Sequence, residues 1–453
     1  MQDLIENVRD QRNAVPPSMT RQLGCWFSYF HPGLMVGVSP AGEEQPLDSE
    51  RTLSTSVNVR IRESMAPSSE FMDGNAAVVS LADGILERSH LDDDSLFPLL
   101  AALAILMYGE RLDEAASWCG SLRAEAAARR SPTWEALFAA THAMISLRQG
   151  DLLAAERHAG SALGILPAQS WGIAIGLPLS AAVLSATARG DEWQAETLLD
   201  LPVPDGMFHT PCGLHYLYAR GWYYLSVGRP QAALYEFELC GRMMAEWGIF
   251  FPTFALWRLG AARAHLLLGD PETAARFVEE QLALTAPGHH RTRGHALRFL
   301  AAARGGDPAL LDESALLLED SGDRLGLAWT MADLSDARQR LGDSDEARTL
   351  AFRAQVLAEQ CGTDVRPGRT GDDAEDEGPA VGTVLGELSD AQRRVAALAA
   401  AGHTNREISD KLHVTVSTVE QHLTIVYRKL RVRRIGLRRV FEGASTAPRG
   451  PVG

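Results

Sequence analysis

The sequence predicts an all-α chain, in which an α-solenoid of about seven helical hairpins precedes a small C-terminal helical domain. A glycine-centred motif recurs seven times between residues 109 and 342. Apolar residues recur at three- and four-residue spacing, as in 255–268, which is typical of a helix face. Three helix starts with the pattern S/T-x-x-E/Q follow one another after residue 388.

The first 85 residues are rich in Pro, Gly and Ser, as in "PPSMTR" and "HPGLMVGVSP". Only 75–88 has a convincing helical pattern. We therefore expect 1–85 to be a capping or partly disordered segment.

Residues 86–362 carry the repeat, in which a helical run ends in Gly, a starter residue follows, and Ala comes three to five residues later. Glycine favours the left-handed backbone that follows a helix end, and Asp or Pro favours the start of the next helix. A small Ala one turn later allows the two helices to approach closely. The spacing of 36 to 41 residues predicts a tetratricopeptide-like helical repeat domain. The seven glycines are Gly109, Gly150, Gly190, Gly228, Gly269, Gly306 and Gly342.

A solenoid binds partners along its concave face, so the repeat domain is predicted to be a sensor or an interaction surface; a plain spacer is the alternative. Aromatic residues cluster in 216–224 and 247–251. They indicate either packing between repeat helices or a ligand-binding patch for a small-molecule or protein effector.

Composition excludes several classes of protein. The five cysteines have no metal-ligand spacing, and "GHHRTRG" at 288–294 has no partner ligands, so we expect no metal and no cofactor. The only lysines are Lys411 and Lys429, which excludes a GxxxxGK[ST] phosphate-binding loop.

The uncharged run 167–188 contains Pro and several hydroxyl residues, so a buried repeat helix is a better interpretation than a membrane span. No nucleophile–base motif is present, which predicts a protein that is not an enzyme.

Charge divides the chain. Residues 387–453 hold 12 Arg/Lys and 6 Asp/Glu, a net charge of +6, so the preceding 386 residues hold 31 minus 52, or −21. The acidic, Gly- and Pro-rich stretch 363–386 is predicted to be a flexible linker. We expect a DNA-binding domain over 387–440 and a disordered tail over 441–453.

The C-terminal domain has the pattern of a helix-turn-helix. Ser389 with Gln392, Thr404 with Glu407, and Ser417 with Glu420 each predict a capped helix start, and Thr415 is an alternative start for the third helix. On a helical projection, the third helix buries one apolar face (Val419, Leu423, Val426, Tyr427 and Leu430) and exposes a polar, basic face (Ser417, Gln421, Thr424, Arg428 and Arg431).

The stretch "LSDAQRRVAALAAAGHTNREISDKLHVTVSTVEQHLTIVYRKL" resembles the LuxR-type helix-turn-helix, a four-helix DNA-binding domain. Its "TNREI" and "H-L-…-Y-R-K-L" elements are most similar to the MalT-like large ATP-binding regulators, in which an ATPase precedes a helical-repeat sensor. The chain resembles the sensor and DNA-binding portion without the ATPase domain. The family's glycine after "KL" is replaced by Arg431, and its glutamate at the first cap by Gln392.

The resemblance implies a bacterial cytoplasmic, nucleoid-associated transcriptional regulator. It would be a pathway-specific activator, for example of a secondary-metabolite gene cluster, that binds double-stranded DNA as a homodimer and contacts RNA polymerase. A repressor of the same architecture and a solenoid scaffold without DNA contact are the alternatives. The residues expected at DNA are Thr404, Asn405, Arg406, Thr415, Ser417, Thr418, Glu420, Gln421, Thr424, Arg428, Lys429 and Arg431.

Overall fold

The computed structural model describes residues 76–88, 91, 95–249, 252–364, 388–400, 405–412, 414–415, 418–419, 421–423 and 425–426. Two compact units result, one formed by 1–190 and 198–371 and the other by 191–197 and 372–453. Most of 1–85, the linker and the tail lie outside the described residues, so these boundaries remain predictions.

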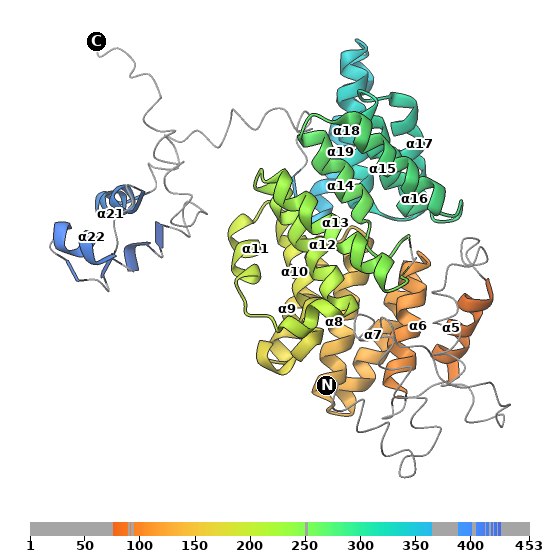
Figure 1. The fold of residues 1–453 in the computed structure, drawn as a ribbon, viewed down its shortest axis with the longest axis horizontal. Coiled ribbons are helices and arrows are strands. Elements are labelled where there is room, and N and C mark those ends of the chain that lie inside the picture. The colour runs from red at the N-terminus through yellow and green to blue at the C-terminus, as the bar shows by residue number, and fades with distance from the viewer. Residues whose placement is uncertain are drawn as a thin grey trace. The chain divides into compact units, whose positions relative to one another are not determined.

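The large unit holds the predicted solenoid apart from 191–197, and the described residues contain helices but no strand. After α5 (Ala76–Arg88), seven helix pairs follow in chain order (Figure 1). The pairs are α6 (Leu96–Tyr108) with α7 (Leu112–Ala128), α8 (Pro132–Arg148) with α9 (Leu152–Ile165), α10 (Gly176–Ala188) with α11 (Glu192–Leu199), α12 (Pro211–Ser226) with α13 (Pro230–Glu246), α14 (Trp257–Leu267) with α15 (Pro271–Leu284), α16 (His290–Ala303) with α17 (Pro308–Asp320), and α18 (Arg324–Arg340) with α19 (Ser344–Cys361). Short 3-10 turns lie at Ala168–Ser170, Gly172–Ile175 and Asp205–His209.

The turns inside the pairs follow the glycine motif with one exception. The motif glycines from Gly150 to Gly342 all have positive φ, as predicted. The prediction is wrong at Gly109, whose φ is −77°, because the left-handed position falls on Glu110 at φ 62°. Arg130, in the turn between α7 and α8, is a second left-handed residue that is not glycine, at φ 55°.

The alanine of the motif is buried in six copies, for instance Ala115 and Ala155, which are fully enclosed. The sixth copy differs, because Ala309 is exposed and Leu311 takes the buried position. Aspartates cap several helix starts as predicted; the Asp151 side chain accepts from the Ala154 N–H at 2.9 Å.

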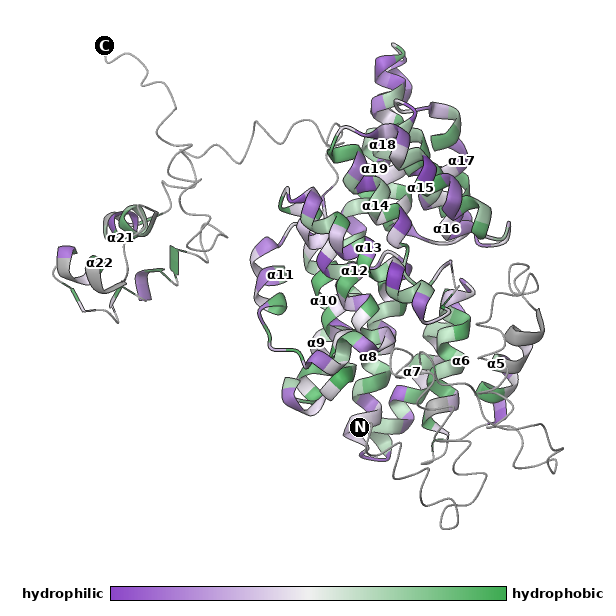
Figure 2. Cartoon of the chain, viewed as in Figure 1, coloured by the Kyte–Doolittle hydropathy of each residue, from purple (hydrophilic) through white to green (hydrophobic). Residues whose placement is uncertain are grey.

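The uncharged run 167–188 forms the first two 3-10 turns and α10, and the side chains of α10 are mostly buried among other helices. Figure 2 shows the helices of the solenoid with hydrophobic and hydrophilic faces, whereas α6 is hydrophobic along nearly its whole length. Within the described part of the chain, no helix is both long enough and apolar enough to cross a membrane.

The first helices of the pairs form the inner side of the solenoid. Each contacts the first helix of the next pair, from α6 through α8, α10, α12, α14 and α16 to α18. The second helices show no contact of similar extent with one another. Elements on the inside of a curved array lie closer together than those outside, so the first helices line the concave face.

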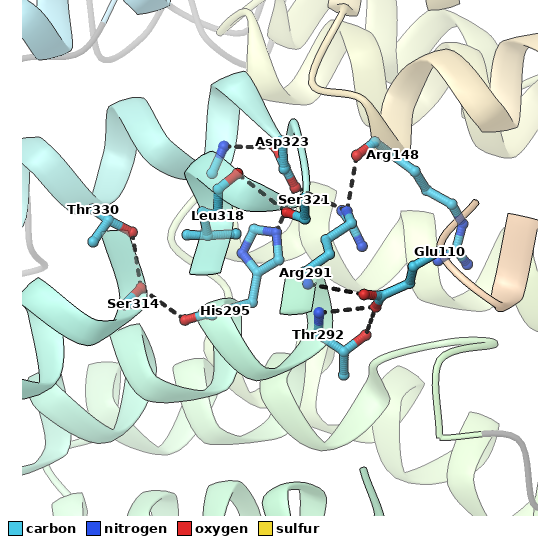
Figure 3. A network of polar contacts seen from close by, with 12 residues as sticks. Glu110, Arg148, Arg291, Thr292, His295, Ser314, Leu318, Ser321, Asp323 and Thr330 are labelled. Carbon is cyan, nitrogen blue, oxygen red and sulfur yellow. Dashed lines mark hydrogen bonds and ion pairs between the residues drawn. The ribbon is translucent and has the colours of Figure 1, made fainter. Parts of the chain in front are cut away.

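The solenoid also closes on itself. Glu110 accepts hydrogen bonds from the N–H groups of Arg291 and Thr292 at 2.9 Å, so the α6–α7 turn caps the start of α16 (Figure 3). The Arg291 Nε lies 2.9 Å from the Arg148 carbonyl oxygen and 2.8 Å from Asp323 Oδ2. We call these residues, with His295, the closing network; the Asp323 carboxylate also bonds to His295 Nε2 at 2.8 Å.

Apolar contacts also join the early and late helix pairs of the solenoid. Leu152 at the start of α9, Leu325 at the start of α18 and Cys361 at the end of α19 form one buried cluster. A Cβ at Gly150 would lie 2.5 Å from the Leu325 backbone nitrogen, so this approach requires glycine. The second pair therefore packs directly against the seventh.

Most of the aromatic cluster serves helix packing. The Trp222 ring lies 5.9 Å from Phe237 and 6.2 Å from Phe299, measured between centroids, and joins α12 to α13 and α16. Tyr216 is 2% exposed. Packing between repeat helices is confirmed for these residues; Phe250 and Phe251 lie outside the described residues.

Candidate nucleic-acid interface

The first helix of the C-terminal domain begins at a reciprocal cap. The Ser389 N–H donates to Gln392 Oε1 at 3.1 Å, and the Gln392 N–H donates to Ser389 Oγ at 3.3 Å. α21 (Asp390–Ala400) follows directly. The predicted capping box is confirmed, and Gln392 performs the role that glutamate has in the family pattern.

A single apolar cluster holds the domain together. It brings Val395, Ala396 and Ala399 of α21 against Ile408 of α22 (Asn405–Leu412), each 3% exposed or less. Val419, Leu423 and Val426 complete the cluster, and Leu412 packs against it. The predicted core face of the third helix is thus confirmed for its described members; Tyr427 and Leu430 lie outside them.

The turn between the two helices of the motif is short. The Val414 N–H donates to the Ser409 carbonyl oxygen at 3.1 Å and closes the end of α22. The Thr415 Oγ1 then accepts from the Thr418 N–H at 3.1 Å, while the Val419 N–H donates to the Thr415 carbonyl oxygen. Of the two starts considered, the described contacts favour Thr415 over Ser417, because Thr415 makes both bonds of an N-cap.

The third helical segment presents polar groups away from this core. Residues 418–419, 421–423 and 425–426 are helical. Gln421 is exposed and Thr418 is partly exposed, whereas Val419 and Leu423 beside them are buried. An exposed glutamine amide near the start of a helix offers both a donor and an acceptor, the pair that recognises adenine in the major groove.

Other predicted interface residues are only partly described. Asn405 and Arg406 form the first turn of α22, but their side chains lie outside the described residues. Those wholly outside are Thr404, Ser417, Glu420, Thr424, Arg428, Lys429 and Arg431.

Two side chains add to the sequence-based picture. Lys411, one of the two lysines of the chain, is exposed at the end of α22 and was not among the residues predicted to contact DNA. His422 is partly buried, and its Nδ1 atom lacks a hydrogen-bond partner within the described part of the domain. It lies between the core face and the exposed face, a position that suits a supporting residue.

Comparison with known proteins agrees with this geometry. Residues 386–435 match the family model described as bacterial regulatory proteins, luxR family. The chain therefore carries a LuxR-type helix-turn-helix domain.

Curated relatives are similar over 179 residues at 30% identity. Two of them are each named "Putative HTH-type transcriptional regulator", Rv0890c of Mycobacterium tuberculosis (strain H37Rv) and Mb0914c of Mycobacterium bovis. The similar segment covers 37% of this chain and 20% of each relative, so the chain matches about a fifth of their length.

Among solved structures, the fold is similar to a Rap protein complexed with Competence and Sporulation Factor. The TM-score is 0.51 at 14% sequence identity, over 70% of this chain and 89% of that chain. This likeness concerns the helical fold alone.

Proposed function

We propose that this protein is a transcriptional regulator in which the solenoid senses an effector and the LuxR-type domain binds a specific double-stranded DNA sequence. The observation that carries the proposal is the Thr415-capped helix, which exposes Gln421 opposite a closed apolar core. A helix-turn-helix needs both features, because the core fixes the helix and the exposed side chains contact base edges.

The proposed DNA contacts divide into two kinds. Thr404, Asn405, Arg406, Thr415, Ser417, Thr418, Arg428, Lys429 and Arg431 hold phosphates. Glu420, Gln421 and Thr424 face the bases. The net charge of +6 over 387–453 favours attraction to DNA, while the acidic remainder of the chain opposes non-specific adsorption.

The further elements of the proposal are a cytoplasmic, nucleoid-associated location, a homodimer on DNA and a contact with RNA polymerase. We propose that the protein is not an enzyme and that it activates a specific pathway, for example a secondary-metabolite gene cluster. The Rap structure is a complex with a factor, and a solenoid of that fold supports effector binding as the role of residues 86–362.

Genome-wide footprinting of the protein tests this function. We expect discrete protected sites with paired half-sites, whose spacing reports the symmetry of a dimer. A reporter driven by a protected promoter should be more active when the protein is present. Lower activity would identify a repressor, and the absence of discrete sites would favour a protein scaffold.

A further inference from the structure

α19 is the second helix of the seventh pair, and it ends the solenoid. Among the described elements, its only extensive contacts are with α18. The second helices α9, α13, α15 and α17 each contact the first helix of the following pair as well. α19 therefore has an outer side that no following pair covers. Its buried residues lie on the opposite side and are Ala347, Leu350, Ala354, Ala358 and Cys361.

Phe352 lies at the middle of this outer side. It is 71% exposed, more than any other large hydrophobic side chain among the described residues. The terminal repeat of a solenoid usually has a polar outer face, because no further repeat covers it. An isolated exposed apolar residue needs no explanation, so the residues around Phe352 decide whether this face is an interface.

Four residues of α19 form one stripe through Phe352. Arg348, Phe352, Gln355 and Glu359 follow one another at spacings of four, three and four residues, which places them on the same side of the helix. Gln355 is partly exposed and the other three are exposed. Arg348 pairs with Asp345 of its own helix, whereas Glu359 Oε1 accepts from Gln355 Nε2 at 2.8 Å. The stripe thus has a base at one end, an acid at the other and an aromatic ring between them.

The spacing of the stripe reads the same in both directions, so an antiparallel copy of α19 matches it. With a two-fold axis between residues 353 and 354, Arg348 lies opposite Glu359 of the second copy, and Phe352 lies opposite Gln355. The symmetry repeats both contacts. The two Phe352 rings are then separated by about 4.5 Å along the helix direction, close enough for contact across the axis. The stripe is therefore complementary to itself in charge and in apolar surface.

Charge also selects this register over a neighbouring one. Placing the two Phe352 side chains directly opposite each other would bring Asp345 against Glu359 of the second copy, and like charges that face each other are unfavourable. Arg348 and Glu359 are both exposed, so a single ion pair between them contributes little free energy. The charged ends of the stripe therefore determine the alignment, and Phe352 supplies the apolar contact.

We propose that the outer side of α19 is the surface through which two copies of this chain associate as an antiparallel, two-fold dimer. This inference rests on the proposed function, because it specifies where the homodimer of that regulator forms. The self-complementary stripe is the reason to assign a second copy as the occupant. A single helix pair buries less than the roughly 1,200 Å² typical of stable interfaces, so the dimer is weak and depends on protein concentration.

Sedimentation equilibrium of the full-length chain without DNA tests this surface. We expect the mass of the unaltered protein to rise from one chain toward two as its concentration increases. Arg348→Glu should weaken the dimer by at least about tenfold, because it faces Glu359 in both halves of the interface. Glu359→Arg should weaken it similarly. The double variant should restore the dimer, since opposite charges then meet again with their signs exchanged.

Phe352→Glu should abolish the dimer, because it places two carboxylates beside the two-fold axis. Tyr235→Glu is the matched control and should keep the dimer, since Tyr235 is also an exposed aromatic residue, at 59%, but lies on α13. All these substitutions are at exposed positions, so the variants should retain the helical circular dichroism of the unaltered protein.

Three results would overturn the proposal. They are an unaltered protein that stays monomeric at every concentration, a double charge variant that associates no better than the single variants, and a dimer that persists in Phe352→Glu. DNA binding is measured separately. Gln421→Ala with Arg428→Ala should lose DNA affinity but keep the dimer, whereas Arg348→Glu should still bind a single half-site. The failure of the dimer surface can therefore be distinguished from the failure of DNA recognition.

Discussion

At the scale of single residues, Arg148 shows how a buried charge can be structural. It is 8% exposed, donates to the carbonyl oxygens of Thr253 and Phe254, and lies 4.9 Å above the Tyr108 ring. These contacts connect the end of α8 to the segment before α14, about a hundred residues later. The cation stabilises the solenoid because it supplies donors to two enclosed carbonyl oxygens.

Arg148→Met should therefore lower the free energy of unfolding by about 2–4 kcal/mol, because two buried carbonyl oxygens lose their donor. Urea unfolding at constant pH measures the change. Arg348→Met, at an exposed position, should differ from the unaltered protein by less than about 0.5 kcal/mol. Equal stability of the two variants would contradict the structural role of Arg148.

The buried imidazole of His215 predicts sensitivity to acid. It is 3% exposed and bonds to the Tyr108 hydroxyl at 2.8 Å; burial, and then Arg148, lowers its pKa to about 3. Between an unfolded pKa near 6.5 and about 3, the unfolded state binds a proton that the folded state does not. Stability should therefore fall with decreasing pH across this window, by roughly 1.4 kcal/mol per unit for one such group.

The double variant Tyr108→Phe with His215→Phe should have a flatter pH profile of unfolding free energy, because it removes this histidine and its hydroxyl partner together. The profile is measured by urea unfolding between neutral and mildly acidic pH. An unchanged slope would show that His215 does not titrate as its burial requires.

Residue-scale prediction from the sequence worked where a local rule applied. The Ser389–Gln392 cap and the core face of Val419, Leu423 and Val426 depend only on neighbours along the chain. The contacts of Arg148 could not be predicted in this way. Which acceptors a buried arginine reaches, as Arg148 reaches the carbonyl oxygens of Thr253 and Phe254, depends on the distant segments that the fold brings to it.

At the scale of elements, the turns between successive helices differ in which residue adopts the left-handed backbone conformation. Gly342 has φ of 88°, and a Cβ there would meet no atom within 4 Å. A substitution at this position therefore affects stability only through the backbone conformation. Arg130 has φ of 55°, is exposed and forms the same kind of turn without glycine. The left-handed region favours glycine over residues with a side chain. Replacing the glycine at 342 and introducing a glycine at 130 should therefore have opposite effects on stability.

Gly342→Ala should lower the free energy of unfolding by about 1 kcal/mol, and Arg130→Gly should raise it by up to about 1 kcal/mol. Both follow from the steric cost of a left-handed residue with a side chain. Thermal or urea unfolding of the two variants checks the signs. Changes of the same sign in both would show that something other than backbone conformation controls these turns.

The glycine motif predicted these turns well, and its failure at Gly109 has a physical cause. There the left-handed residue is Glu110, whose carboxylate accepts three hydrogen bonds from Arg291 and Thr292 at the start of α16. Those bonds offset the strain of a left-handed glutamate. Because the partner lies 181 residues away, no pattern near residue 110 could reveal it.

At the scale of the whole molecule, the closed solenoid differs from a simple linear array. In an open array each repeat contacts only its neighbours, and unfolding can proceed one repeat at a time. Here the closing network and the Leu152–Leu325–Cys361 cluster join the first two pairs to the last two. We therefore expect the solenoid to unfold as one cooperative unit, a property that the repeat period alone does not predict.

Arg291→Ala should reduce this cooperativity, because it leaves Asp323, which is 2% exposed, without its arginine partner. Breaking a buried pair costs about 3 kcal/mol or more, and the two ends of the solenoid would then separate before the rest unfolds. A lower m value or two transitions in urea is the expected result. Arg304→Ala, at an exposed pair with Glu279, is the control; identical curves for the two variants would contradict cooperative closure.

We propose that the LuxR-type domain makes this chain a sequence-specific DNA-binding protein. The most direct test is the affinity of the full-length chain for a footprinted duplex as salt concentration is varied. We expect the affinity to fall steeply with salt, and the double variant Gln421→Ala with Arg428→Ala to bind at least about tenfold more weakly with a shallower salt dependence. Unchanged affinity and salt dependence in that double variant would contradict DNA recognition through this helix.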